Sequence, residues 1–249
     1  MSLIELCDKG DLEGVKAALE GGVDVNTKFE DGWTGLMQAV CYPERHSKYN
    51  NHNSVVALLL KTPNIDVNQK DGLGLCALHT AVSCAQVVKT WRRTVEYNEA
   101  VKLLLNVPNI DVNIVDPEGR TAVHHAVVYN NIEGLKLLLD VPGIDVNIVD
   151  DMGRSAVHWA VNQDNSKALK LLLSHPGLTS HTLNQKMDGF SRGQKNAKNK
   201  TPVKSAIQGN RLKCLSLLVA DLRVDLDTKR GRSLYSRPLY PWTLEEWAR

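Results

Sequence analysis

The sequence predicts an all-α solenoid of about six stacked helix–turn–helix repeats joined by β-hairpin-like loops. Three observations predict this fold class. First, one motif recurs along the chain as TGLMQA, CALHTA, TAVHHA, SAVHWA and TPVKSA. Second, a leucine-rich segment follows each copy, and third, most copies then end in DVN. Neither helix of such a unit can bury its apolar side alone, so neighbouring units must stack to form a continuous core.

The predicted repeats start near residues 1, 34, 76, 121, 155 and 201, and the solenoid spans residues 1–233. Four starts carry a hydroxyl residue, which we expect to cap the first helix by accepting a backbone N–H of its first turn. The expected caps are Thr34, Thr121, Ser155 and Thr201. Pro202 follows the last cap at the first helical position, where its missing N–H has no cost.

The second predicted helix of each repeat carries the leucines, and the DVN segment then crosses over as a loop to the next repeat. A glycine precedes most caps by two residues and is expected to form the tight turn of that loop. These glycines are Gly32, Gly74, Gly119 and Gly153.

The unequal spacing of the repeats predicts three insertions, near 43–50, 85–95 and 183–199. The first two should fall at the turns between the helices of a repeat, and the third in the hairpin region, because a stack tolerates insertions only where they leave its interface. Trp91 lies among valines in the second insertion, which predicts a lengthened first helix or an extra turn. Packing of Trp91 on its own repeat is the favoured interpretation.

The C-terminal tail, residues 234–249, departs from the repeat pattern and is rich in tryptophan and tyrosine. Thr243 and Glu246 form a capping-box pattern that predicts a short helix. Two interpretations remain open: a hydrophobic cap over the last repeat, which we favour, and a docking peptide for a partner.

Composition and charge narrow the class of protein. The 249 residues are 43% hydrophobic with a net charge of +2, so global charge indicates neither nucleic acid nor an acidic membrane as the partner. The N-terminus lacks the features of a signal peptide, and no segment is apolar enough to span a membrane. The five cysteines are irregularly spaced and are expected to be reduced, buried thiols. We therefore expect a monomeric cytoplasmic protein, with a nuclear location also open.

The recurrent motif resembles the ankyrin repeat, whose consensus T-P-L-H-x-A has a period of about 33 residues. The resemblance covers residues 1 to about 233 and implies a stack with a concave binding groove. It also implies that His79, His124 and His158, one in each of three repeats, form structural hydrogen bonds and are not metal ligands. From the same resemblance, the asparagines that end DVN are possible targets of asparaginyl hydroxylation: Asn26, Asn68, Asn113 and Asn147.

Candidate catalytic chemistry is scarce in this sequence. No nucleophile-elbow, zinc-protease, phosphate-loop or dinucleotide-binding motif occurs, and Cys84 has no histidine beside it in sequence. We therefore predict a non-enzymatic adaptor or scaffold with no cofactor and no metal.

The residues that vary between copies predict the partner-binding site. In the ankyrin family, the residue after the motif histidine faces the groove, and the residue before each cap lies on the same side. Arginine and tryptophan at such positions are typical of binding hot spots, and two arginines beside a histidine favour an acidic or phosphorylated protein segment with an apolar anchor. The predicted site residues are Trp33, Gln38, Leu75, Thr80, Arg120, His125, Arg154 and Trp159.

An alternative function is binding of nucleic acid or a phosphate ligand through the same groove and the basic loop 186–204. That loop contains six basic residues and one acid, Asp188. The near-neutral net charge argues against nucleic-acid binding. Phe190 is the single aromatic residue of the loop, so base stacking has little support there. A solvated loop without a binding role is the favoured interpretation. The six basic residues are Lys186, Arg192, Lys195, Lys198, Lys200 and Lys204.

Overall fold

The computed structural model describes residues 1–41, 51–84, 91–187 and 200–226, with the side chains of 91–97 left aside. It divides into two compact units, Met1–Ile144 and Asp145–Arg249, and each is considered by itself. Within the described ranges the regular elements are helices, so the predicted all-α fold is confirmed.

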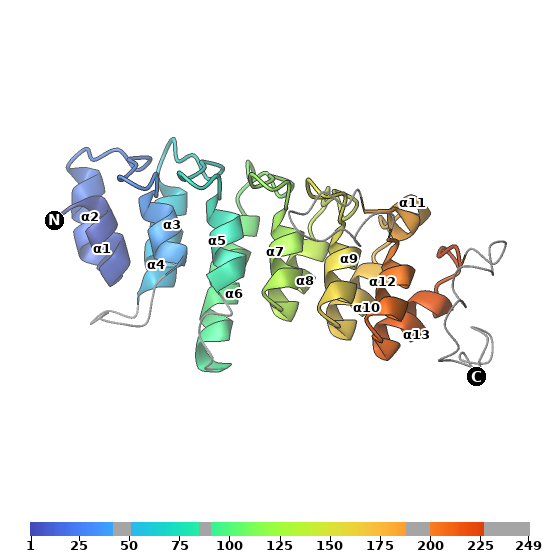
Figure 1. The fold of residues 1–249 in the computed structure, drawn as a ribbon. Helices are drawn as coiled ribbons and strands as arrows, with labels where there is room; N and C mark the ends of the chain where they lie inside the picture. The colour runs from blue at the N-terminus through green and yellow to red at the C-terminus, as the bar shows by residue number, and fades with distance from the viewer. Residues whose placement is uncertain (42–50, 85–90, 188–199, 227–249) are drawn as a thin grey trace. The chain divides into compact units, whose positions relative to one another are not determined.

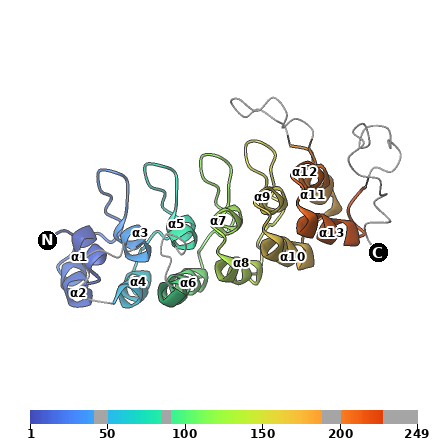
Figure 2. The same cartoon turned by 60° about the horizontal axis from the view of Figure 1, so that its bottom comes forward.

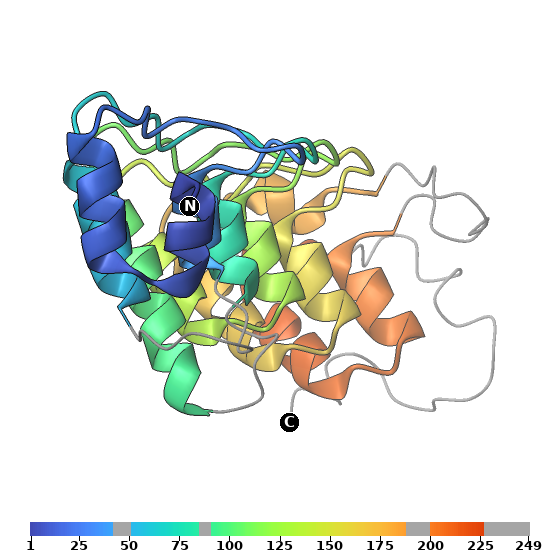
Figure 3. The ribbon, with the colours of Figure 1, turned by 90° about the vertical axis from the view of Figure 1, so that its left-hand side faces the viewer.

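Unit 1 contains four helix pairs in chain order (Figure 1). The first helices α1, α3, α5 and α7 pack in one row, and α2, α4, α6 and α8 pack in a second row, as the view along the unit shows (Figure 3). The pairs are α1 (Leu3–Lys9) with α2 (Leu12–Glu20), α3 (Gly35–Val40) with α4 (His52–Lys61), α5 (Ala77–Cys84) with α6 (Trp91–Leu105), and α7 (Ala122–Val128) with α8 (Ile132–Leu139).

Unit 2 repeats this arrangement with α9 (Ala156–Asn162) beside α10 (Ser166–Ser174), and α12 (Pro202–Gln208) beside α13 (Leu212–Ala220). Helix α9 packs on α12 and α10 on α13, so the stacking rule of unit 1 holds here too. An additional short helix, α11 (Ser180–Asn184), replaces the DVN turn of its repeat.

The predicted caps begin the first helices. Thr34 Oγ1 accepts the N–H of Met37, and Thr201 Oγ1 accepts the N–H of Lys204. At Thr121 and Ser155 the motif histidine completes a reciprocal box: His124 Nδ1 accepts the Thr121 N–H at 3.1 Å, and His158 Nδ1 accepts the Ser155 N–H at 3.2 Å. A motif hydroxyl thus caps the start of α3, α7, α9 and α12, and in α7 and α9 the motif histidine completes the box.

The leucine-rich second helices supply the core. In α4, α6, α8, α10 and α13 at least one leucine is completely buried, because positions three and four apart turn the same side of a helix toward its neighbour. These leucines include Leu59, Leu104, Leu138, Leu172 and Leu218, each 0% exposed.

The loops before α3, α5 and α7 project side by side beyond the first helices of unit 1 (Figure 2). Each is a hairpin: the bridge between Lys28 and Thr34, for example, closes the first of them. Gly32 has φ +74°, and a Cβ there would meet the backbone N of Gly72 at 2.5 Å, so the hairpins before α3 and α5 pack too closely for any other residue.

The DVN asparagines connect successive turns. Asn68 shows the pattern: its Nδ2 donates to the Asn109 carbonyl at 2.8 Å, and its Oδ1 accepts the Asp111 N–H at 2.9 Å. Asn26 bonds Asn64 and Asp66 in the same way. Hydroxylation of the DVN asparagines stays a prediction, but both polar groups of the Asn26 and Asn68 side chains already have structural partners.

The insertions are partly described. Residues 43–50, and most of 183–199, lie outside the described residues, although the Met187 N–H donates to the Lys200 carbonyl at 3.1 Å and closes the base of the third loop. The second insertion is predicted to form a lengthened first helix or an extra turn. Its residues 91–95 belong instead to the second helix, α6, which has 15 residues from Trp91. Residues 85–90 and the packing of the Trp91 side chain lie outside the described residues. No helix-breaking glycine or proline separates residues 91–95 from the leucine-rich segment, so the second helix continues through them.

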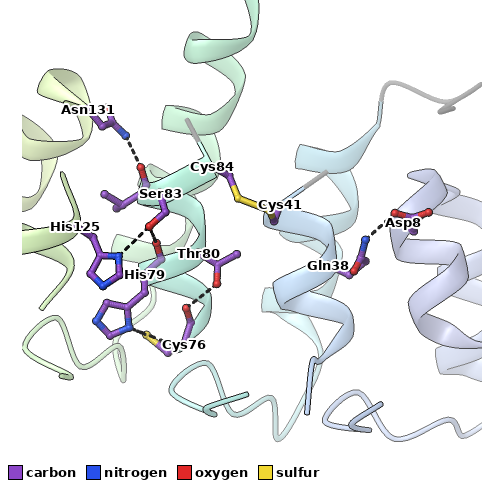
Figure 4. Close-up of a disulfide and its surroundings, with 11 residues drawn as sticks. Asp8, Gln38, Cys41, Cys76, His79, Thr80, Ser83, Cys84, His125 and Asn131 are labelled. Atoms are coloured by element: carbon purple, nitrogen blue, oxygen red, sulfur yellow. Dashed lines mark hydrogen bonds between the residues drawn. A yellow bond between two sulfur atoms is a disulfide. The ribbon is translucent and has the colours of Figure 1, made fainter. Parts of the chain in front are cut away.

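The expectation that all five cysteines are reduced is also wrong. Cys41, at the end of α3, and Cys84, at the end of α5, form a disulfide with a Cα–Cα distance of 5.7 Å (Figure 4). Both cysteines come at the end of a first helix in consecutive repeats, so stacking brings them together. The other three cysteines are free and buried, and burial raises the pKa of Cys7 and Cys214 to about 12.

Candidate functional site

The hairpin before α7 is organised by the Asp116 carboxylate. Its Oδ1 accepts the backbone N–H groups of Glu118 at 3.0 Å and Arg120 at 2.8 Å, which fixes the turn. Its Oδ2 accepts Arg120 Nε at 2.8 Å and lies 2.9 Å from His125 Nε2. Burial alone would raise the pKa of Asp116, but these donors outweigh it and lower the pKa to about 2. The carboxylate is therefore ionised and closed on all sides by its own hairpin and helix.

His125 connects this hairpin with the preceding repeat. Its Nδ1 lies 2.9 Å from the hydroxyl of Ser83 on α5, and the residue is only 4% exposed (Figure 4). Burial lowers the pKa of His125, although the hydrogen bond with Asp116 opposes this. The sequence predicts that His125 faces an open groove, whereas in the structure its side chain is buried between α5 and the hairpin before α7.

Ser83, His125 and Asp116 follow one another in the order of a catalytic triad, yet their contacts are those of a structural network. The Ser83 hydroxyl lies 2.8 Å from the His79 carbonyl one turn back on α5 and donates to it. Asp116 is committed to the turn of its hairpin. We therefore assign this row of bonds to the cohesion of two repeats.

The hairpin before α9, in unit 2, has the same carboxylate in a different setting. Asp150 Oδ2 accepts Arg154 Nε at 2.7 Å and Trp159 Nε1 at 3.0 Å. The guanidinium carbon of Arg154 lies 4.1 Å from the centroid of the Trp159 ring, in cation–π geometry. Both side chains are partly exposed, so a stacked arginine and tryptophan form part of the surface here.

The remaining predicted site residues lie in unit 1. Trp33 and Leu75 are partly exposed, while Thr80 is buried and its hydroxyl donates to the Cys76 carbonyl at 3.2 Å. Gln38 is partly exposed and its Nε2 donates to Asp8 Oδ1 at 2.6 Å, which joins α3 to α1 (Figure 4). Of these four, Thr80 and Gln38 thus have a side-chain hydrogen bond within the stack.

Among the predicted site residues, Arg120 and His125 belong to unit 1, whereas Arg154 and Trp159 belong to unit 2. The structure brings the members of each pair together through a shared aspartate. A single patch formed by both pairs stays a prediction. Of the basic loop, Lys186, Lys200 and Lys204 are described, and none of their contacts indicates a phosphate or nucleic-acid site.

The site residues predicted from the sequence do not include the aspartates that organise these hairpins. Their signal was nevertheless present, because an aspartate stands five residues before the cap in three copies of the motif. Asp71, Asp116 and Asp150 occupy this position. In the repeat before them the position is Phe29, so that hairpin has no such carboxylate.

The motif histidines have structural partners, as the resemblance implied. His158, for example, bonds Ser155 through Nδ1 and lies 3.2 Å from the Gln185 carbonyl through Nε2. Burial lowers the pKa of His79 and of His158 to about 4, which keeps both rings neutral. Within the described ranges, no group of three or more His, Cys, Asp or Glu side chains has the spacing of a metal site, and no helix is long and apolar enough to cross a membrane.

The comparisons with a family model and with solved structures agree on one family. A family model described as ankyrin repeats (3 copies) matches residues 3–90, 93–186 and 143–230. The solved structure of the ankyrin repeat domain of Bcl-3, a member of the IkappaB protein family, is similar with a TM-score of 0.70 at 24% identity, covering 90% of this chain and 87% of that one. The ankyrin repeat protein EF0377 is similar with a TM-score of 0.68 at 20% identity, covering 88% and 96%. No curated protein matches the chain in sequence.

Proposed function

The chain belongs to the ankyrin repeat family, and we propose that it acts as a non-enzymatic adaptor that binds a segment of a partner protein through its hairpins and first helices. Ankyrin repeats are generally protein-interaction modules. We propose further that it works as a monomer in the cytoplasm. The Cys41–Cys84 disulfide is unusual for a reducing compartment, so location deserves a direct measurement.

One observation supports the proposal most strongly: the stacked pair of Arg154 and Trp159. Tryptophan and arginine are the residues most enriched in binding hot spots. Here Asp150 fixes both of them through Nε and Nε1, so little side-chain entropy is lost when a partner binds. A partner segment with an apolar anchor for the Trp159 ring, and an acidic or phosphate group that approaches the positive charge of the Arg154 guanidinium, fits this surface.

Affinity purification with quantitative mass spectrometry tests the proposal. Trp159→Ala should reduce the recovery of a specific partner, since the loss of a hot spot costs about 2 kcal/mol or more, some thirtyfold in affinity. Lys167→Ala, an exposed change on α10, is the matched control and should leave recovery unchanged. The melting temperature of each variant is measured alongside. If Trp159→Ala melts normally and still recovers every partner, the proposed surface is wrong.

A further inference from the structure

The hairpin before α5 has the same carboxylate as the two hairpins described above. Asp71 Oδ1 accepts the backbone N–H groups of Leu73 at 2.9 Å and Leu75 at 2.8 Å. These bonds repeat those that Asp116 Oδ1 makes with its own hairpin. The turn is therefore formed by the same hydrogen bonds. The hairpins differ in the donors that bond the second carboxylate oxygen, Oδ2.

The second oxygen of Asp71 is unsatisfied. In the other two hairpins Oδ2 receives two donors, an arginine Nε and a ring N–H of histidine or tryptophan. In this repeat Leu75 stands at the arginine position, and Thr80 stands at the ring position and donates to the Cys76 carbonyl instead. Among the described residues no donor bonds Asp71 Oδ2, although the atom is buried and the residue only 8% exposed.

A buried carboxylate oxygen without a donor lowers the stability of the folded protein, because it has lost its hydrogen bonds to water and no protein donor replaces them. The nearby lysines do not remove this cost. Lys70 Nζ donates to the Val115 carbonyl at 2.8 Å, and Lys28 Nζ donates to the Lys70 carbonyl at 2.7 Å. The ammonium groups of Lys70 and Lys28 are thus directed to backbone oxygens and not to Asp71.

Building on the proposed function, we propose that the Asp71 carboxylate is a binding site for the guanidinium group of an arginine in the partner protein. The chain itself shows the chemistry, since Arg120 and Arg154 fill the equivalent place in two other repeats. The partner's arginine would supply in trans the bond that these residues supply in cis.

The surroundings of Asp71 fit a long basic side chain with an apolar stem. Leu73, at the tip of the hairpin, is 70% exposed, and Leu75 is partly exposed, so both can contact the methylene groups of an arginine. The exposed Asp31 belongs to the adjacent hairpin, whose tip is joined to this one by the bond from the Gly72 N–H to the Asp31 carbonyl at 2.9 Å. Because Oδ2 is buried, a guanidinium group can reach it only after a side chain moves aside. We assign this movement to Leu75, which occupies the motif position that Arg120 and Arg154 occupy in their repeats.

The test uses small probes and the whole chain, without any natural partner. N-acetyl-arginine methylamide is titrated against isotope-labelled protein, with the uncharged citrulline analogue and the lysine analogue as matched probes. The amide signals of Leu73 and Leu75 report on binding, since both N–H groups donate to Asp71. We expect a saturable shift with the arginine probe, little with lysine and none with citrulline.

Two variants and one control decide the role of Asp71. Leu75→Arg should fill the site in cis, raise the unfolding midpoint and abolish the arginine-dependent shift. Asp71→Asn should abolish the shift and retain the fold, because the amide oxygen can still accept the hairpin N–H groups. Leu222→Arg makes the same substitution at a fully exposed leucine of unit 2 and should leave the shift in place.

Several outcomes would overturn the assignment: no shift with arginine, an equal shift with citrulline or lysine, or a shift that survives Leu75→Arg or Asp71→Asn. The result is separable from the test of the proposed function. Loss of a partner with Trp159→Ala concerns unit 2, whereas the probe titration detects the Asp71 site directly.

Discussion

The hairpins before α7 and α9 share an aspartate, an arginine four residues later and the same turn, but differ at the residue after the motif histidine. In unit 1 that residue is His125, which is buried and meets Ser83 of the preceding repeat. In unit 2 it is Trp159, which stays partly exposed under a guanidinium. The residue at this place thus accompanies a difference in what the hairpin carboxylate holds: a contact between two repeats in one case, and a partly exposed arginine–tryptophan pair in the other.

The largest expected effect comes from removing the carboxylate that is sealed within unit 1. Asp116→Ala leaves two hairpin N–H groups, the Arg120 guanidinium and the His125 ring without their acceptor. We expect a loss of about 3–5 kcal/mol in the free energy of unfolding, measured by urea denaturation. Asp150→Ala is the comparison and should cost less, because Trp159 and Arg154 can turn to water. Equal losses would contradict the distinction between the hairpins.

Removal of the disulfide should have the next largest effect on the free energy of unfolding. Among the described residues, a disulfide occurs in unit 1 alone. Replacing Cys41 and Cys84 by serine removes a cross-link across 43 residues, and we expect a loss of about 2–4 kcal/mol from the greater entropy of the unfolded chain. Thiol titration of the denatured, unreduced protein should find three free thiols. The wild-type protein under reducing conditions should unfold like the double variant, and five titratable thiols without reductant would disprove the link.

Acid should destabilise the stack through its neutral histidines. Burial lowers the pKa of His158 to about 4, below the value of about 6.5 expected when unfolded, so the unfolded chain binds more protons between these values. Stability from this residue is complete above about pH 6.5 and falls as the pH drops towards 4. Urea midpoints across this range measure the effect. His158→Gln keeps a capping-box side chain that does not titrate, and should flatten the pH dependence. An unchanged slope would exclude His158 as its source.

The smallest expected effect is that of Trp159→Phe, which retains a ring but loses the bond to Asp150 Oδ2. Since Arg154 Nε still donates to that oxygen, we expect a loss of about 0.5–1.5 kcal/mol in stability, measured by thermal or urea unfolding. A loss of several kcal/mol would mean that Trp159 belongs to the core, and would remove the contrast with His125.

The sequence by itself determined the repeats, the caps and the structural histidines of this protein. These features are local: Thr121 and His124 lie three residues apart, so their reciprocal bonds depend only on the helix turn between them. The leucines of the second helices follow in the same way from helical periodicity.

Only the tertiary structure decided which side chains meet between repeats. The Ser83–His125 bond spans 42 residues, and the Cys41–Cys84 disulfide spans 43, so neither pairing follows from local spacing. The same holds for exposure. Thr80 and His125 occupy the position of Trp159 in the motif, yet they are buried, because burial depends on the size of the side chain and on what the neighbouring repeat presents to it. Asp71 is the clearest example. Its Oδ2 has no donor among the described residues, because Leu75 and Thr80 do not supply the two N–H groups that arginine and histidine or tryptophan supply in the other two hairpins.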